Sequence, residues 1–99
     1  VVVFDNVFVD YGVRIGDFSV LNLNVTICHN TIISENVIFS PNSLATGGSE
    51  IGKNSFIGSN VTINPYIKIG SECIIGTGSV AIKDCLKSGT YVGIPAHEL

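Results

Sequence analysis

A period of six residues runs through almost the whole chain and limits its possible folds more than any other feature. Stepping by six from Val3 to Ala81 reaches fourteen positions, and every one is apolar. Four places after each stands a small or β-branched residue, and three places after ten of them stands Asn or Gly. Asn and Gly tolerate the left-handed backbone conformation of a tight turn. Each hexad therefore predicts a short strand followed by a corner.

Three such hexads close a triangular coil of eighteen residues, and coils stack as parallel strands about 4.8 Å apart. Fourteen hexads give a little under five coils, or about 22 Å of height. We therefore expect an all-β prism over residues 1–86 in unbroken register, with residues 87–99 as a short C-terminal extension. Val1 falls in mid-hexad, so we also expect the prism to have started upstream in a longer protein.

Composition and charge narrow the classes of partner and compartment. Ile (14) and Val (12) far outnumber Leu (5), as is typical of strands. The net charge of −3 argues against nucleic acid as a partner. No apolar run has the length of a membrane span, and the start lacks the basic segment of a secretory signal. Three cysteines without CxxC spacing indicate neither a disulfide framework nor a zinc knuckle, so we expect a soluble cytoplasmic protein.

Residues 51–55 (IGKNS) and 69–73 (IGSEC) fit the pattern [LIV]-[GAED]-x-x-[STAV]-x. The chain thereby resembles the hexapeptide-repeat acyltransferases over residues 1–95, and especially the bacterial sugar O- and N-acetyltransferases that act on sialic acids and nucleotide amino sugars. The segments 78–84 and 91–96 resemble the close of the coenzyme A-dependent members. The resemblance implies a left-handed parallel β-helix of about five triangular coils.

The same resemblance implies an activity and an assembly. We expect acetyl-CoA-dependent transfer of an acetyl group to a hydroxyl or amine of a sugar or nucleotide-sugar, without a covalent enzyme intermediate. The resembling enzymes are homotrimers with the active site between subunits. In them an N-terminal nucleotide-sugar domain selects the acceptor, and residues 1–99 contain no such domain.

The expected catalytic residues are His29 and Asn30. His29 is the only histidine inside the hexads, and residues 25–33 (VTICHNTII) resemble the segment that carries the catalytic base of the subfamily. Imidazole suits general-base catalysis near neutral pH. Asn30 stands where those enzymes usually have Asp or Glu, and an amide cannot stabilise imidazolium as a carboxylate does. Asp10, which stacks beneath Cys28, is either the substitute for that charge or a solvated surface carboxylate.

The expected acetyl-CoA site begins beside the histidine. Stacking by eighteen places Gly47 and Gly48 above His29 and Asn30, which leaves a shelf without side chains. We expect the pantetheine arm to reach the imidazole across Gly47. Backbone N–H groups near the two glycines are candidates for stabilising the oxyanion.

Further cofactor contacts follow from the resemblance. It assigns the backbone around Gly58, Ser59, Gly76 and Thr77 to pantetheine, and Ser59 and Thr77 lie eighteen residues apart. Lys83 is a candidate for the nucleotide phosphates, as a point charge. No metal is expected.

Two other functions use the same prism. A zinc-dependent carbonic anhydrase needs three histidine ligands at one site, and the hexads contain only one histidine. A non-catalytic module for trimerisation or sugar binding stays open, because Asn30 in place of a carboxylate weakens a histidine base.

Overall fold

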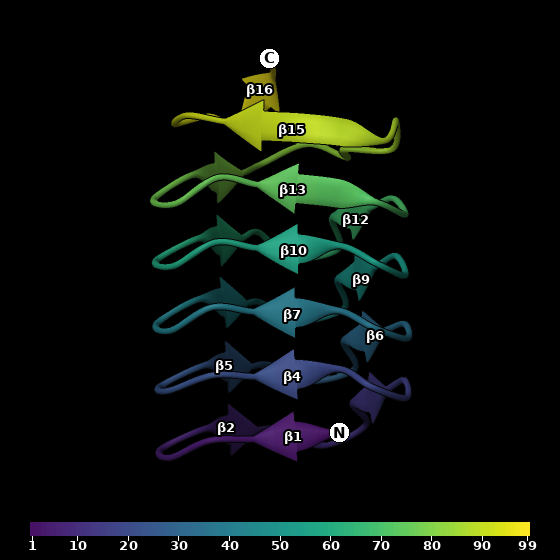
Figure 1. Cartoon of the computed structure of the whole chain (residues 1–99), viewed down its shortest axis with the longest axis vertical. Helices are drawn as coiled ribbons and strands as arrows, with labels where there is room; N and C mark the ends of the chain where they lie inside the picture. The colour runs from purple at the N-terminus through teal and green to yellow at the C-terminus, as the bar shows by residue number, and fades with distance from the viewer.

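The computed structural model describes residues 1–99, and its regular elements are all β-strands. Figure 1 shows the chain climbing from the N-terminus to the C-terminus as a stack of coils. The strands at the front run to the left and those behind run to the right as the chain climbs, so the coil is left-handed. The prism measures 31 × 21 × 20 Å along its principal axes. The expected left-handed parallel β-helix of about five coils is confirmed.

Three sheets form the faces of the prism, and each of the first four coils contributes one strand to each face. The seven-stranded sheet contains β1 (Val2–Val3), β4 (Val20–Leu21), β7 (Ile38–Phe39), β10 (Phe56–Ile57), β13 (Cys73–Ile75), β15 (Gly89–Val92) and β16 (His97–Glu98). The five-stranded sheet contains β2 (Phe8–Val9), β5 (Thr26–Ile27), β8 (Leu44–Ala45), β11 (Thr62–Ile63) and β14 (Val80–Ala81). The four-stranded sheet contains β3 (Arg14–Ile15), β6 (Ile32–Ile33), β9 (Glu50–Ile51) and β12 (Lys68–Ile69).

The corners adopt the conformation that the hexad pattern predicts. Every residue at the expected turn position, from Asn6 to Gly78, has a φ between 55° and 75°. Phe18, Tyr66 and Glu72 adopt this conformation too, although bulky and charged residues seldom do. Stacking against the neighbouring coils therefore decides the backbone at these corners against the residues' own preference.

The inward residues form one continuous core of nineteen buried apolar side chains. The small inward position is often a hydroxyl, which bonds either to the adjacent coil or, at Ser43 and Ser49, to the carbonyl three residues earlier. Ser19 Oγ, for example, donates to the carbonyl of Ser34 at 2.9 Å and accepts the N–H of Val37 at 3.0 Å. No buried side-chain nitrogen or oxygen lacks a partner, as a stable polar lining requires.

The last coil is two residues shorter than the others. Strands are related by eighteen residues through Ala81, but Cys85 pairs with Ile69 across only sixteen. The carboxylate of Asp84 accepts the N–H of Lys68 at 2.9 Å and closes this tighter corner. The predicted unbroken register to residue 86 is therefore right through Ala81 and wrong beyond it.

Residues 87–99, expected as a short extension, continue the seven-stranded sheet. β15 pairs with β13 in parallel, and β16 folds back against β15 as the only antiparallel pair. Lys87 and Glu98 form the one ion pair of the chain, at 3.7 Å. Both side chains are exposed enough that this pair contributes little to stability.

The first coil has no coil beneath it, so its inward side chains remain open. Val3 is 53% exposed and Val9 is 41% exposed, whereas the equivalent Leu21 and Ile27 are fully buried. The lower end of the prism is therefore apolar. The chain has no helix with the length and hydrophobicity needed to cross a membrane.

Candidate functional site

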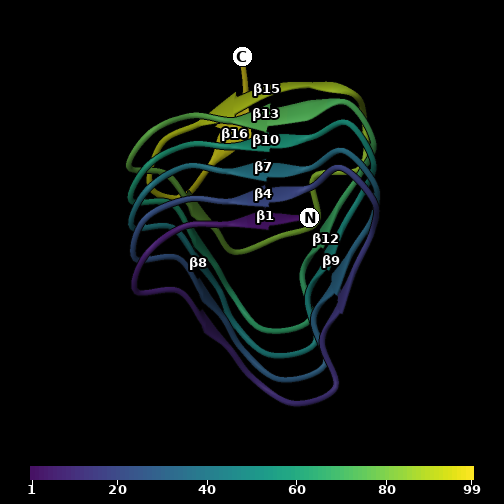
Figure 2. The ribbon, with the colours of Figure 1, turned by 60° about the horizontal axis from the view of Figure 1, so that its bottom comes forward.

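His29 lies at the corner that joins the five-stranded sheet to the four-stranded sheet, between β5 and β6. We call residues 28–31 and their equivalents in other coils the His29 corner; in Figure 2 it is the lower edge of the prism, where β8 turns into β9. The backbone is fixed by coil stacking, since the N–H of Gly48 donates to the carbonyl of His29 at 2.9 Å. The side chain projects outward and is half-buried.

The expected shelf above His29 is filled by two aromatic rings. The imidazole covers Gly47, and a Cβ at Gly47 would overlap Nε2 of His29. The phenol ring of Tyr66 leans over Gly48 from above, where a Cβ would lie 2.5 Å from two ring carbons. Gly47 is therefore needed to admit the imidazole itself. The Gly48 N–H is also not free for an oxyanion, because it donates to His29.

Asn30 is the polar partner of the imidazole. Its Nδ2 lies 3.5 Å from Nδ1 of His29, at the limit for a hydrogen bond. Gly12, one coil below, leaves the space that the amide occupies. An amide can present either its nitrogen or its oxygen to Nδ1, and only the oxygen would accept a proton held there and leave Nε2 free as a base.

Asp10 does not replace the missing carboxylate. Its Oδ1 accepts the N–H of Tyr11 at 2.8 Å, and the only ion pair within 4.0 Å in the chain lies elsewhere, in the C-terminal extension. Of the two interpretations of Asp10, the surface carboxylate is the one the geometry favours.

Tyr11 contacts His29 through its ring, and the sequence pattern had not predicted this contact. Its ring stacks on the imidazole with a centroid separation of 5.8 Å and an interplanar angle of 15°. The interval of eighteen between the two residues was the available signal, since it places Tyr11 directly below His29. The imidazole is thus held between a phenol ring below and a glycine above.

Cys28 precedes the histidine but is a poor nucleophile. Partial burial, and secondarily the negative charge of Asp10, raise the pKa of its thiol above 9.0. The sulfur therefore stays protonated near neutral pH, and a thiol needs the thiolate form to attack.

The other expected cofactor residues lie on a different edge of the prism. Gly58, Ser59, Gly76 and Thr77 belong to the corner that joins the seven-stranded sheet to the five-stranded sheet, here called the Ser59 corner. Ser59 is half-buried and Thr77 is exposed. Gly58 is buried, and a Cβ there would lie 2.7 Å from the backbone nitrogen of Thr77; a Cβ at Gly76 would meet the side chain of Val92. Stacking of the coils therefore accounts for both glycines.

Lys83 lies in the turn after β14, at the top of the His29 corner, and is exposed. Because the last coil is two residues short, Lys83 does not continue the column of Tyr11, His29 and Gly47 in strict register. A single chain therefore groups His29, Asn30, Gly47 and Lys83 at one corner and leaves Gly58, Ser59, Gly76 and Thr77 at another.

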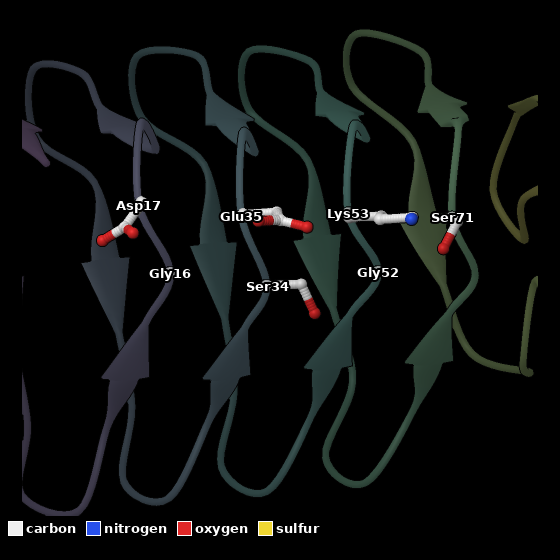
Figure 3. Close-up of a pocket in the computed structure, with 7 residues that line it drawn as sticks. All are labelled: Gly16, Asp17, Ser34, Glu35, Gly52, Lys53 and Ser71. Atoms are coloured by element: carbon white, nitrogen blue, oxygen red, sulfur yellow. The ribbon is translucent and has the colours of Figure 1, made fainter.

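A polar groove of about 510 Å³ marks the third corner, between β3 and β4 and their equivalents. Figure 3 shows Asp17, Glu35, Lys53 and Ser71 from successive coils in one row beside it. The groove holds no histidine, cysteine or aromatic side chain. It therefore offers neither the candidate base nor any of the expected cofactor residues. No three His, Cys, Asp or Glu side chains lie together as metal ligands would.

Residues 48–82 match the family model described as bacterial transferase hexapeptide (six repeats). The chain is a hexapeptide-repeat left-handed β-helix. No curated protein matches it in sequence.

Solved structures share this β-helix over nearly its whole length. The chain is similar to a maltose O-acetyltransferase from Clostridium difficile 630, with 27% identity and a TM-score of 0.90 over 98% of the chain and 64% of that chain. It is similar to a variant of perosamine N-acetyltransferase from Caulobacter crescentus in complex with CoA and GDP-perosamine, with 25% identity and a TM-score of 0.85 over 99% of the chain and 52% of that chain.

The acetyltransferase domain of PglB from Neisseria gonorrhoeae FA1090 has the same fold, with 24% identity and a TM-score of 0.87 over 98% of the chain and 56% of that domain. The hexapeptide-repeat chain thus spans roughly half to two thirds of these structures.

Proposed function

We propose that this hexapeptide-repeat protein transfers an acetyl group from acetyl-CoA to a hydroxyl or amine of a sugar or nucleotide-sugar. The observation that carries the proposal is the placement of His29, whose imidazole projects from a corner of the prism with Nε2 over Gly47. Likeness to a maltose O-acetyltransferase and a perosamine N-acetyltransferase supports the substrate class. The three free cysteines and the use of acetyl-CoA fit the cytoplasm as its compartment.

In the proposed reaction, Nε2 of His29 takes the proton of the acceptor O–H or N–H while the acceptor atom bonds to the acetyl carbon. The carbon–sulfur bond then breaks, and the coenzyme A thiolate takes the proton back from the imidazolium. The acetyl group moves directly, so the enzyme carries no covalent intermediate. Asn30 orients the ring through Nδ1, and its amide oxygen is the atom suited to that task.

The two groups of site residues support an active site shared between subunits. The His29 corner and the Ser59 corner lie on opposite edges of the five-stranded sheet, so one chain cannot bring them together. Packing of the His29 corner of one subunit against the Ser59 corner of the next would complete the site. Repetition of such a head-to-tail contact closes a ring. We therefore propose a homotrimer with three equivalent sites.

The outer faces of the prism differ in a way that fits this assembly. The seven-stranded sheet presents an in-register apolar ladder, in which Phe56 is 42% exposed and Ile74 is 47% exposed. The full ladder is Val2, Val20, Ile38, Phe56 and Ile74. The five-stranded sheet presents only uncharged residues, Phe8, Thr26, Leu44, Thr62 and Val80. The four-stranded sheet presents charges at Arg14, Glu50 and Lys68.

Both uncharged faces meet at the Ser59 corner. Contiguous exposed apolar surface of this kind marks protein interfaces. The Ser59 corner is therefore the edge suited to burial in the trimer, and the charged four-stranded face is suited to solvent.

Acetyl transfer is tested by incubating the full chain with acetyl-CoA and each of two acceptors, maltose and GDP-perosamine. We expect release of the free coenzyme A thiol above the rate of hydrolysis, together with an acceptor whose mass has increased by one acetyl group. Binding is measured in parallel by calorimetric titration with acetyl-CoA. A chain that binds no acetyl-CoA would contradict the proposal for any acceptor.

Sharing of the site is tested with two variants that fail for different reasons. His29→Ala removes the base, and Thr77→Trp is expected to block the Ser59 corner. Each alone should be inactive. Trimers assembled at random from a one-to-one mixture should recover about one quarter of the wild-type rate, since one interface in four pairs an intact His29 corner with an intact Ser59 corner. The control is a chain that carries both changes, and trimers formed from this chain alone should show no acetyl transfer. If the mixture still forms trimers but regains no activity, the proposal of a site shared between subunits is wrong.

A non-catalytic function is the second candidate for this protein, because Asn30 stands where a carboxylate would support the histidine. The imidazole has no carboxylate partner, and its hydrogen bond to the amide is long. A trimerisation or sugar-binding module would need no base, and it would not bind acetyl-CoA. The calorimetric titration therefore separates the two functions before any acceptor is known.

A further inference from the structure

The stacked pair of Tyr11 and His29 is an unusual use of an exposed aromatic side chain. Tyr11 is 70% exposed and contributes little to the core. Its carbonyl accepts the N–H of Asn30 at 3.0 Å, which fixes the first coil directly below the histidine. The two rings are nearly parallel, with centroids 5.8 Å apart. A cation within about 6 Å of a tyrosine ring centroid is attracted by the negative face of the ring.

No other neighbour offers a protonated imidazole a compensating charge. Asn30 is a neutral amide, and the thiol of Cys28 stays protonated near neutral pH because burial and then Asp10 raise its pKa. Asp10 accepts the N–H of Tyr11, and no carboxylate forms an ion pair with His29.

The elements above the histidine bring no negative charge to its ring. Gly47 has no side chain, and Tyr66, which leans over Gly48, is uncharged. Lys83 is a cation in the last coil and is exposed. Apart from the neutral amide of Asn30, the face of Tyr11 is therefore the one electron-rich group in contact with the ring.

We propose that Tyr11 is a positioning residue that takes the place of the absent carboxylate. Its ring holds the imidazole over Gly47 and stabilises the imidazolium that forms when His29 accepts a proton. The catalytic part of this inference rests on the proposed acetyl transfer, whereas the contact between Tyr11 and the imidazolium does not.

The step at which Tyr11 acts follows from the proton's path. The acceptor proton moves to Nε2 as the acceptor atom bonds to the acetyl carbon, and it leaves Nε2 when the departing thiolate is protonated. The imidazole is positively charged only between these two events. An interaction made only with the charged ring lowers the barrier without tightening substrate binding. Tyr11 should therefore affect kcat and leave the KM for acetyl-CoA unchanged.

The kinetic test compares Tyr11→Leu with Tyr11→Phe. We expect Tyr11→Leu to lower kcat about two- to fivefold at constant KM, and Tyr11→Phe to keep the wild-type kcat because it keeps the ring face. Adding Asn30→Asp to Tyr11→Leu should restore kcat, since a carboxylate supplies the missing charge. Phe18→Leu is the matched control, because Phe18 is 79% exposed in the same coil but lies at another corner. An equal loss in Tyr11→Phe and Tyr11→Leu would overturn the proposal.

A second test does not depend on turnover. A double-mutant cycle of Tyr11→Leu and His29→Ala measures the coupling of the two side chains in urea unfolding at about pH 5 and about pH 8.5, on either side of the range where imidazole titrates. We expect the coupling at the lower pH to be larger by about two- to fivefold in the unfolding equilibrium constant. Equal coupling at both pH values would overturn the role of Tyr11 toward the imidazolium. Failure of acetyl transfer with the coupling intact would instead overturn the proposed function.

Discussion

Replacing His29 with alanine should lower the rate of acetyl transfer about 10²- to 10⁴-fold, because general-base catalysis contributes that much. His29 is the only histidine at a corner of the prism, and no neighbouring side chain is placed to take its proton. Asn30 is an amide without a basic nitrogen, Tyr11 presents its ring face to the imidazole, and the thiol of Cys28 is held protonated. The measurement is kcat with saturating acetyl-CoA and acceptor, followed by release of coenzyme A.

The fold should survive this substitution. The backbone at His29 is held by the hydrogen bond from Gly48, which the side chain does not share. His97→Ala is the matched control, since His97 is exposed in β16 and its Nδ1 lies 3.3 Å from the carbonyl oxygen of Pro95 in the C-terminal extension. We expect the control to keep wild-type kcat, and both variants to bind acetyl-CoA. A His29→Ala enzyme with more than about a tenth of the wild-type rate would exclude the histidine as the base.

The repeat predicted the backbone because two of its positions determine the coil. The inward apolar residue and the left-handed corner recur every six residues, so they place each coil on the one below. The six-residue period failed to predict the backbone after Ala81, where the coil is two residues shorter and the carboxylate of Asp84 accepts the N–H of Lys68. A sequence repeat does not predict where a side chain takes the place of a backbone carbonyl as the hydrogen-bond acceptor between coils.

The site was harder to predict than the fold because the repeat does not determine the rotamers of exposed side chains. The interval of eighteen correctly placed Gly47 over His29. It did not show that the imidazole fills that space, or that Tyr66 covers Gly48. The same interval also places Tyr11 below His29, but only the rotamer of Tyr11 creates the stack. How the His29 and Ser59 corners meet depends on a second subunit, which the sequence of one chain does not describe.

The largest effect on stability is expected at Phe39, the biggest fully buried side chain. Phe39 lies inward on β7 in the middle of the prism. The same coil carries the small Ala45 inward on the adjacent face, and we expect the large Phe39 to fill the space that Ala45 leaves. Phe39→Ala should lower the free energy of unfolding by about 3 to 5 kcal/mol. That is a large part of the roughly 5 to 15 kcal/mol available to a domain of this size.

Urea unfolding followed by circular dichroism measures this loss. Ile32→Ala is the control, because Ile32 is 43% exposed on the outer face of β6, in the sheet suited to solvent, and should cost less than about 1 kcal/mol. The compensation inside the coil gives a sharper test. Phe39→Leu alone should be destabilising, and the addition of Ala45→Val should recover part of the loss, because the second change fills the space left by the first. If Ala45→Val lowers the stability of both backgrounds equally, the two side chains do not share a cavity, and the coils pack as independent columns.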